Sequence, residues 1–340
     1  MTREIAPPLP LVLSMGEPAG IGPEITLKAW AARASGSVPV FFVAGDPDLY
    51  RALARALGLA VPIAEIADAQ GAAACFGDAL PVLPVALGEP AKPGHLSGAN
   101  APAVLASIDL ACELTIRGQA AGMVTNPIHK AALYEAGLHV PGHTEYLAER
   151  TGGATPAMML SCPGLRVVPV TVHLPLKDAA AALTMAAIAE QGTILARALC
   201  TDFGITHPRI AVAALNPHGG EGGHLGREEI EIIAPAIDAI RAAVPGADIR
   251  GPMPADTLFH AAARARYDAV LCMYHDQALI PLKTIDFERG VNTTLGLPIV
   301  RTSPDHGTAL DIAGRGIAHE GSLIAAIRIA DEVARHRANA

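Results

Sequence analysis

Apolar positions along this chain follow two spacings, short continuous runs and longer segments with a helical period. The clearest pairs of run and segment are LPLVLSMG with PEITLKAWAARAS, VPVFFVAGD with DLYRALARALG, AAGMVTN with HKAALYEAG, and RIAVAALN with REEIEIIAPAIDAIRAAV. Continuous apolar runs are typical of strands buried on both faces of a parallel sheet, and the longer period is typical of amphipathic helices. The pattern therefore predicts an α/β protein made of β-α units.

The domain organisation is constrained by length and by the lack of linkers. A chain of 340 residues with 51% hydrophobic content suffices for one large or two ordinary domains. The sequence has no fixed-period repeat, low-complexity tract or long Pro/Gly/Ser linker, so a second domain must share strands with the first or be inserted into it. Apolar runs fall short of the roughly 18 residues of a membrane span, and the start lacks a signal-peptide pattern, so we expect a cytoplasmic protein.

Charge and cysteine content narrow the class of protein further. The net charge is −8, there is no basic run, and aromatic residues make up 4% of the chain, which argues against a nucleic-acid partner. The five cysteines are widely spaced, odd in number and mostly inside apolar runs, which favours reduced core thiols over disulfides. They are Cys75, Cys112, Cys162, Cys200 and Cys272.

Three histidines each follow an apolar strand run. LRVVPVTVHLP places His173, RIAVAALNPH places His218 and DAVLCMYHDQ places His275 after such a run. The carboxyl ends of strands border the ligand crevice of open α/β sheets, so three imidazoles there can converge on one point. Three protein ligands with an open position are typical of a catalytic metal site.

The segments around these histidines offer further groups. Asp276 and Glu221 stand near His275 and His218 and are available as outer acceptors or additional ligands. The glycines of LNPHGGEGGHLG allow backbone N–H groups to approach an anion, and GREEIEI then opens a helix. A plain tight turn remains the alternative for this loop.

Two other segments carry candidate chemistry. MGEPAGIGPEI, at 15–25, matches neither the dinucleotide fingerprint G-x-G-x-x-G nor a Walker loop, so a standard Rossmann or P-loop site is not supported. Towards the other end, Arg301 is suited to bidentate binding of a carboxylate or phosphate, and Lys283 offers a point charge. Surface ion pairs are the alternative for both.

Taken together, these motifs resemble the 4-hydroxythreonine-4-phosphate dehydrogenase (PdxA) family over nearly the whole chain. The matching motifs are GEPAGIGPE (16–24), GHTEYLAER (142–150), VHLPL (172–176), LNPHGGEGGHLG (215–226), GPMPADTLF (251–259), YHDQALIPLK (274–283), VNTTLGLP (291–298) and RTSPDHGTALDIAGRG (301–316). A weaker resemblance extends to isopropylmalate and isocitrate dehydrogenases, through GIGPE and HGTALDIAGRGIA. That weaker resemblance explains how a dehydrogenase can lack the Rossmann fingerprint.

The resemblance implies a fold and a partner. It implies two α/β/α subdomains of the isopropylmalate dehydrogenase kind with the active-site cleft between them. The boundaries we predict are 1–126 plus 296–340 for a terminal subdomain on the cofactor side, and 127–295 for a central subdomain with the metal histidines and the dimer contacts. It also implies a homodimer in which each active site is shared between the two chains.

The resemblance also implies roles for individual residues. By motif, His173, His218 and His275 bind a divalent metal (zinc, magnesium or cobalt) from both subunits. His143 and Thr144 of GHTEY contact substrate together with three residues nearer the carboxyl end, Lys283, Asn292 and Arg301. The residues implied to bind the cofactor, NAD or NADP, lie in the last loop and are Asp305, His306, Gly307 and Asp311. No role is carried over to Asn126 in VTNPIHK.

The reaction that the family implies is the oxidation of 4-phosphooxy-L-threonine by NAD. Its product, 2-amino-3-oxo-4-phosphooxybutanoate, decarboxylates to 3-amino-2-oxopropyl phosphate on the path to pyridoxal 5'-phosphate. A metal on the 3-hydroxyl oxygen favours loss of its proton as hydride leaves. Asp256 and Lys283 are the two candidate bases, and the sequence does not choose between them.

Other functions fit part of the pattern. Paralogues of the same superfamily oxidise threonate or erythronate 4-phosphate, or cis-dihydrodiols of aromatic diacids, and they keep the metal histidines. A zinc hydrolase or a non-catalytic metal- or anion-binding protein would also use three histidines. Neither of the last two accounts for HGTALDIAGRGIA, and GEPAGIGPE, GHTEY and NPHGGEGGHLG favour the vitamin pathway.

Overall fold

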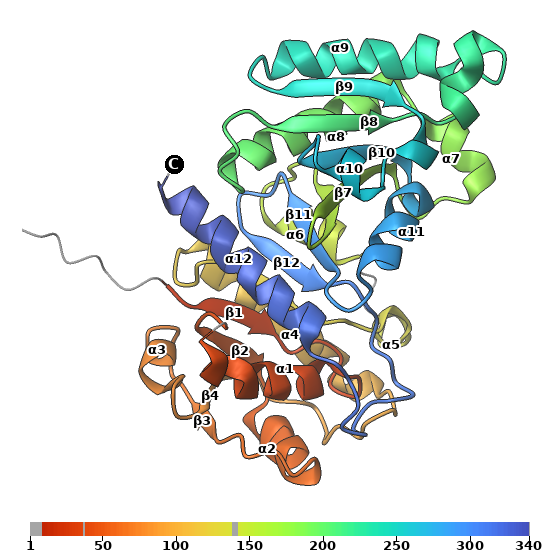
Figure 1. Ribbon diagram of the computed structural model, residues 1–340. Helices are drawn as coiled ribbons and strands as arrows, with labels where there is room; N and C mark the ends of the chain where they lie inside the picture. Colours follow the sequence, from red (N-terminus) through yellow and green to blue (C-terminus); the bar gives the residue numbers. More distant parts are fainter. Residues whose placement is uncertain (1–8, 37, 138–141, 340) are drawn as a thin grey trace, which may run out of the picture. The chain divides into compact units, whose positions relative to one another are not determined.

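A computed structural model describes residues 9–36, 38–137 and 142–339 of the chain (Figure 1). The chain divides into two compact units. Unit 1 comprises Met1–Ala154 and Leu297–Ala334, and unit 2 comprises Thr155–Gly296 and Arg335–Ala340. Each unit contains a buried sheet between helices, so the predicted α/β fold is confirmed.

The sheet of unit 1 is entirely parallel in the described residues. Its strand order is β3-β4-β2-β1-β5-β12. The strands are β1 (Leu11–Ser14), β2 (Phe41–Gly45), β3 (Ile63–Glu65), β4 (Leu80–Pro84), β5 (Met123–Thr125) and β12 (Arg301–Pro304). All residues of the central strands β1, β2 and β5 are buried, as their continuous apolar runs predict.

Helices cover both faces of this sheet. They are α1 (Gly22–Ala31), α2 (Pro47–Ala56), α3 (Gly71–Cys75), α4 (Ala101–Ile116), α5 (Lys130–Glu135), α6 (His143–Arg150) and most of α12 (Gly321–Asn339), with short 3-10 turns η1 (Ala32–Ser35) and η2 (Gly98–Asn100). Val12 of β1 and its pairing partner Phe42 of β2 share a core cluster with Ile108 of α4. Phe41 points the other way, stacking edge-on against Phe76 at 5.2 Å.

The sheet of unit 2 is mixed, with strand order β11-β6-β7-β10-β8-β9. The strands are β6 (Ala157–Cys162), β7 (Leu165–Thr171), β8 (Arg209–Ala213), β9 (Asp248–Met253), β10 (Ala269–Tyr274) and β11 (Val291–Leu295). β6 runs antiparallel to both of its neighbours here, while β7, β10, β8 and β9 are parallel.

Unit 2 also has a helical layer on each face. Its helices are α7 (Leu176–Ala182), α8 (Met185–Thr201), α9 (Ala234–Ala243), α10 (Ala261–Arg264) and α11 (His275–Ile285), with the short elements η3 (Pro217–Gly223), η4 (Glu229–Ile233) and η5 (Ala255–Thr257). Val270 and Cys272 of β10 pack in a cluster with Leu282 of α11. Leu271, between them, faces the opposite side, 3.2 Å from where a Cβ on Gly192 of α8 would stand.

The observed division places 127–154 differently from the sequence-based boundaries. The prediction assigned this stretch to the central subdomain, whereas the structure groups it with unit 1. The reason is packing, because Leu133 of α5 and Leu147 and Ala148 of α6 belong to the same core cluster as α4. The second boundary, at 296/297, lies one residue from the predicted one.

Two smaller expectations concern cysteines and membrane spans. All five cysteines are free thiols, and Cys112, Cys162 and Cys272 are buried, as predicted. One described segment, Gly98–Ile116, has the length and mean hydropathy (1.2) of a membrane span, with half of it buried inside the protein. Its Val104, Ile108 and Ala111 belong to the core of unit 1, which is the position of a core helix.

Candidate functional site

The three predicted metal ligands follow three neighbouring parallel strands of unit 2. The strands stand in the order β7-β10-β8. His173 follows β7, His275 follows β10 as the first residue of α11, and His218 follows β8 within η3. Since the carboxyl ends of parallel strands share one edge, the three histidines lie along the same edge of the sheet.

Two of these histidines are adjacent in the single chain. The ring centroids of His173 and His275 are 6.1 Å apart. Both rings line a small pocket of about 190 Å³, together with Tyr274 and Asp276. The Nδ1 atom of His275 hydrogen-bonds Asp276 Oδ1 at 2.7 Å, so Nε2 is the nitrogen left for a metal. A carboxylate on the far ring nitrogen is the usual support of a metal-binding histidine.

His218 lies in a left-handed turn that its sequence makes possible. From His218 to Gly223 every φ is positive, with 53° at His218 and 47° at Glu221. Side chains avoid this region, so a run of it requires glycine, and four of the six residues are glycine. The buried Glu229 anchors the loop by accepting the N–H groups of Leu215 and Asn216 at 2.9 and 2.7 Å.

The structure does not gather all three histidines into one cluster. Within the described ranges of the single chain, no group of three or more His, Cys, Asp or Glu side chains is arranged to hold a metal ion. His173 shares the positive φ of His218, also at 53°, a backbone conformation that costs about 1–3 kcal/mol and gathers at functional sites. The paired, outward-facing imidazoles therefore fit a metal as a partial ligand set.

A second group of predicted residues meets in unit 1. Arg301, 3% exposed at the start of β12, donates from Nε and Nη2 to Thr125 Oγ1 at 3.1 and 2.6 Å. Burial lowers its pKa to about 10, although the carboxylate of Glu145 opposes this shift. The charges of Arg301 and Lys130 both act on His143. Two predicted substrate residues are thus together, joined by a lysine that the sequence analysis did not single out.

His143 is held neutral by these surroundings. Part of the side chain is exposed, but its Nε2 atom is buried and has no hydrogen-bond partner among the described residues. Burial, followed by the charges of Arg301 and Lys130, lowers the pKa of the imidazole to about 3. Two cations beside a neutral ring nitrogen are groups whose chemistry suits a small anion. Thr144 follows His143 in the first turn of α6 and is half-buried.

The remaining substrate and base candidates belong to unit 2. Asn292 lies on β11, where its Oδ1 atom is buried without a hydrogen-bond partner in the described chain. Lys283 lies on α11, with Nζ 5.3 Å from the ring centre of Phe287. Asp256 is exposed on η5, next to the η3 turn that carries His218. This placement does not distinguish between Lys283 and Asp256 as the base.

The predicted cofactor residues lie in the irregular segment between β12 and α12 in unit 1. The N–H of Asp305 donates to Ser322 Oγ at 3.1 Å, and His306 Nδ1 lies 3.1 Å from the carbonyl oxygen of Gly307. Gly307 and Asp311 are exposed. The side chains that hold this segment, Glu24 and Lys28 of α1, were missed. Their signal was a charged i,i+4 pair within an otherwise apolar helix.

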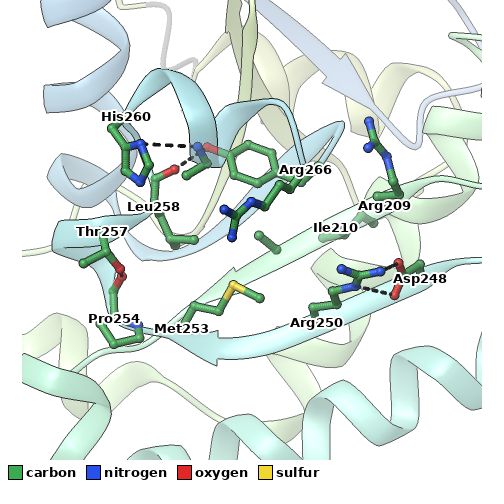
Figure 2. A pocket seen from close by; sticks show the side chains of 13 residues that line it. Arg209, Ile210, Asp248, Arg250, Met253, Pro254, Thr257, Leu258, His260 and Arg266 are labelled. Atoms are coloured by element: carbon green, nitrogen blue, oxygen red, sulfur yellow. Dashed lines mark hydrogen bonds and ion pairs between the residues drawn. The ribbon is translucent and has the colours of Figure 1, made fainter.

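Figure 2 shows a larger cavity of about 330 Å³ in unit 2, between β8, β9 and the η5–α10 segment. Three arginines line it, but Arg250 pairs with Asp248 and Arg209 with Asp268, which neutralises much of their charge. None of the predicted site residues lines this cavity, so it is separate from the candidate chemistry.

The fold is an α/β fold of the kind found in 4-hydroxythreonine-4-phosphate dehydrogenases and related dehydrogenases. The sequence profile described as pyridoxal phosphate biosynthetic protein PdxA matches residues 37–330. The chain therefore belongs to the PdxA family.

Individual relatives carry related names. A "4-hydroxythreonine-4-phosphate dehydrogenase" of Caulobacter vibrioides is 55% identical over 96% of this chain and 98% of its own. The crystal structure of the dehydrogenase of that name from Klebsiella pneumoniae has a TM-score of 0.85 at 37% identity, covering 96% and 99% of the two chains. A terephthalate 1,2-cis-dihydrodiol dehydrogenase from Burkholderia xenovorans has a TM-score of 0.65 at 28% identity, covering 95% and 98%.

Proposed function

We propose that this protein oxidises 4-phosphooxy-L-threonine with NAD or NADP in the biosynthesis of pyridoxal 5'-phosphate. The observation that carries the proposal is the pair of cations, Lys130 and buried Arg301, beside the neutral imidazole of His143, in a chain 55% identical to a relative named for this activity. The substrate is a phosphate ester of an amino acid, and a buried guanidinium with a second cation suits a phosphate or carboxylate group.

Each polar group of the substrate has a suitable partner in this chain. Arg301 and Lys130 bind an anionic end, while neutral His143 shares a hydrogen bond with it. The Oδ1 atom of Asn292 is a buried acceptor without a partner among the described residues, and it suits the substrate ammonium or hydroxyl. Thr144 and Lys283 complete the proposed contacts. These groups hold the substrate carbon in place for hydride transfer.

The reaction itself divides into two steps. NAD or NADP, held by Asp305, His306, Gly307 and Asp311, would supply the acceptor for the hydride of the C3–H bond. The C3 hydroxyl would lose its proton to a base of this chain, for which Lys283 and Asp256 are the candidates. The product is 2-amino-3-oxo-4-phosphooxybutanoate. Its carboxylate then leaves as carbon dioxide, because the new ketone accepts the electron pair. Protonation gives 3-amino-2-oxopropyl phosphate.

The proposal includes a divalent metal and a second copy of the chain. His173, His218 and His275 are the proposed ligands, drawn from both subunits, for zinc, magnesium or cobalt. When bound, such an ion supplies Lewis-acid polarisation at the substrate oxygen. Support for a homodimer comes from unit 2, which carries seven of the eleven exposed large hydrophobic side chains in the described part of the chain. Two of them, Leu174 and Leu176, line the His173–His275 pocket.

The cofactor and its compartment complete the proposal. Asp305, His306, Gly307 and Asp311 are the proposed contacts of NAD or NADP. Five free thiols are compatible with the reducing cytoplasm, where we place the reaction.

The test is an assay of NADH or NADPH formation with purified protein, a divalent metal and 4-phosphooxy-L-threonine. D-threonate 4-phosphate, D-erythronate 4-phosphate and a cis-dihydrodiol of an aromatic diacid are run in parallel, with a chelator as control. We expect metal-dependent turnover that is fastest on the threonine phosphate. Preference for a sugar-acid phosphate would move the protein to a paralogous pathway.

The dihydrodiol is included because of a specific structural neighbour. The terephthalate dihydrodiol dehydrogenase shares the fold at a TM-score of 0.65. Its named substrate carries carboxylates and no phosphate, so turnover of the dihydrodiol alone would replace our proposal with that activity. Turnover of any substrate without dinucleotide would instead indicate a metal-dependent hydrolase.

A further inference from the structure

Two glycine-rich segments from opposite ends of the chain meet at the start of α1. The N–H of Ile21 donates to the carbonyl oxygen of Thr308 at 3.0 Å. A Cβ added to Gly20 would stand 2.9 Å from that same oxygen, so the close approach requires glycine. The GEPAGIGPE motif therefore packs against the segment between β12 and α12 and hydrogen-bonds to it.

Glu24 forms the centre of this contact. Its side chain is fully buried. Oε2 accepts the N–H groups of Gly314 and Gly316 at 3.2 and 3.3 Å, and Oε1 accepts that of Ala318 at 3.0 Å. One carboxylate therefore binds three backbone donors of a segment about 290 residues away.

Lys28, one helical turn later, binds the same segment through its acceptors. Its Nζ atom donates to Glu24 Oε1 at 2.9 Å and to the carbonyl oxygens of Gly316 and Ala318 at 2.9 and 2.6 Å. An ammonium group has three donors, and all three are used. Glu24 and Lys28 together bind five backbone groups of 314–318, a contact that we call the α1 clasp.

The clasp replaces the hydrogen bonds that regular structure would provide. Residues 305–320 form neither helix nor strand, so their peptide groups have no ladder to join. Ordering such a segment costs conformational entropy at every residue, and anchored loops close more readily than free ones. A buried ion pair that also satisfies peptide groups fixes one conformation.

We propose that Glu24 and Lys28 are positioning residues that hold residues 314–318 in the conformation needed to bind the dinucleotide. This inference rests on the proposed function, because that function assigns Asp305, His306, Gly307 and Asp311, which lie in the same irregular segment as 314–318, to the cofactor. It predicts that the affinity for NAD depends on two side chains of α1 whose bonds are to the protein backbone. Substrate affinity should be much less affected, because His143 and Arg301 lie outside the clasp.

The first test replaces Glu24 with Gln. The carboxamide keeps the size of the side chain, but one of its two positions no longer accepts a hydrogen bond. We expect amide hydrogen exchange at 314–318 to accelerate about tenfold or more, and NAD binding to weaken by a similar factor. KM for the phosphorylated substrate should change little. The matched control is Glu113→Gln, which removes an exposed i,i+4 ion pair with Arg117 on α4.

A second pair of variants guards against a folding defect. Lys28 is partly exposed, with 17% of its side chain accessible, so Lys28→Met should fold even if Glu24→Gln does not. We expect Lys28→Met to accelerate exchange at 314–318 and to weaken NAD binding, and Lys28→Arg to restore part of both. Unchanged exchange in Lys28→Met, or faster exchange with unchanged NAD affinity, would overturn the inference.

The outcome is separable from that of the proposed function. If the wild-type protein bound no dinucleotide at all, the assignment of the segment to a cofactor would fail together with the role proposed for the clasp. Hydrogen exchange would still report whether Glu24 and Lys28 fix the loop. If the wild-type protein oxidised a different phosphorylated hydroxy acid with NAD, the inference would stand and only the substrate would change.

Discussion

The Nε2 atom of His143 is buried near the charges of Arg301 and Lys130, and this arrangement decides the charge of the ring. An imidazolium there would lose hydration and face two cations, so the neutral form is favoured. An incoming anion would meet the same two positive charges. A bound phosphate or carboxylate would reverse the local field and raise the pKa of His143 from its low value of about 3.

The first consequence is a pH-dependent stability. The pKa of His143 is about 3 in the folded chain, against about 6.5 for free imidazole, so between these values the unfolded state binds more protons. Stability from this residue is present above pH 6.5 and is lost as the pH falls towards 3. We expect His143→Gln to gain on wild type by about 1 kcal/mol for each pH unit below 6.5.

Urea unfolding of both proteins between pH 7.5 and pH 5 measures this difference. His260→Gln is the matched control, because His260 is exposed and is not part of the group formed by His143, Arg301 and Lys130. A difference between wild type and His143→Gln that stayed constant with pH would contradict the depressed pKa.

At the scale of elements, the turn from His218 to Gly223 depends on glycine for two distinct reasons. At Gly222 the positive φ of 64° is the requirement, since a Cβ there would meet nothing within 4 Å. At Gly220 the φ is 78°, and a Cβ would also stand 2.7 Å from Glu229 Oε2, the carboxylate that anchors the loop. Packing and backbone geometry can therefore be separated.

We expect Gly220→Ala to destabilise the protein more than Gly222→Ala. Backbone strain costs about 1 kcal/mol at either position, and displacing the buried Glu229 carboxylate from its backbone donors adds about 1–3 kcal/mol at Gly220. Denaturant midpoints of the two variants provide the comparison. Equal losses would show that Glu229 moves without cost and does not anchor the turn.

For the whole molecule, the sequence predicted the helices, the strands and the sheet edge that carries the three histidines better than it predicted long-range contacts. The period of apolar residues was enough to find the β-α units, and the strand runs before His173, His218 and His275 were enough to place them along one edge. The sequence did not show that α5 and α6 pack in unit 1. The spacing of apolar residues around Leu133 and Leu147 would be the same whichever core these helices joined. Long-range partners such as Glu24 with Gly314 leave no periodic signal in a single sequence.

The last prediction concerns assembly and the metal together. Among the described residues of one chain, His173 and His275 are adjacent, but no three-ligand group forms. The proposed metal site would therefore be completed by a ligand from a second chain. Ile280 lies on α11, the helix that begins at His275, and its side chain is 65% exposed. We therefore choose it as a candidate dimer contact. Replacing it with Glu would place an unpaired charge in an apolar interface.

We expect wild type to sediment as a dimer, and Ile280→Glu to sediment as a monomer with at least about tenfold weaker binding of zinc. Ile116→Glu, at the 53% exposed end of α4 in unit 1, is the control and should keep both properties. Sedimentation velocity and zinc titration on the same samples measure the two effects. A monomeric Ile280→Glu that kept wild-type zinc affinity would show that one chain holds the metal alone, through a rearrangement of the His218 turn. A dimeric Ile280→Glu would instead place the subunit contact elsewhere.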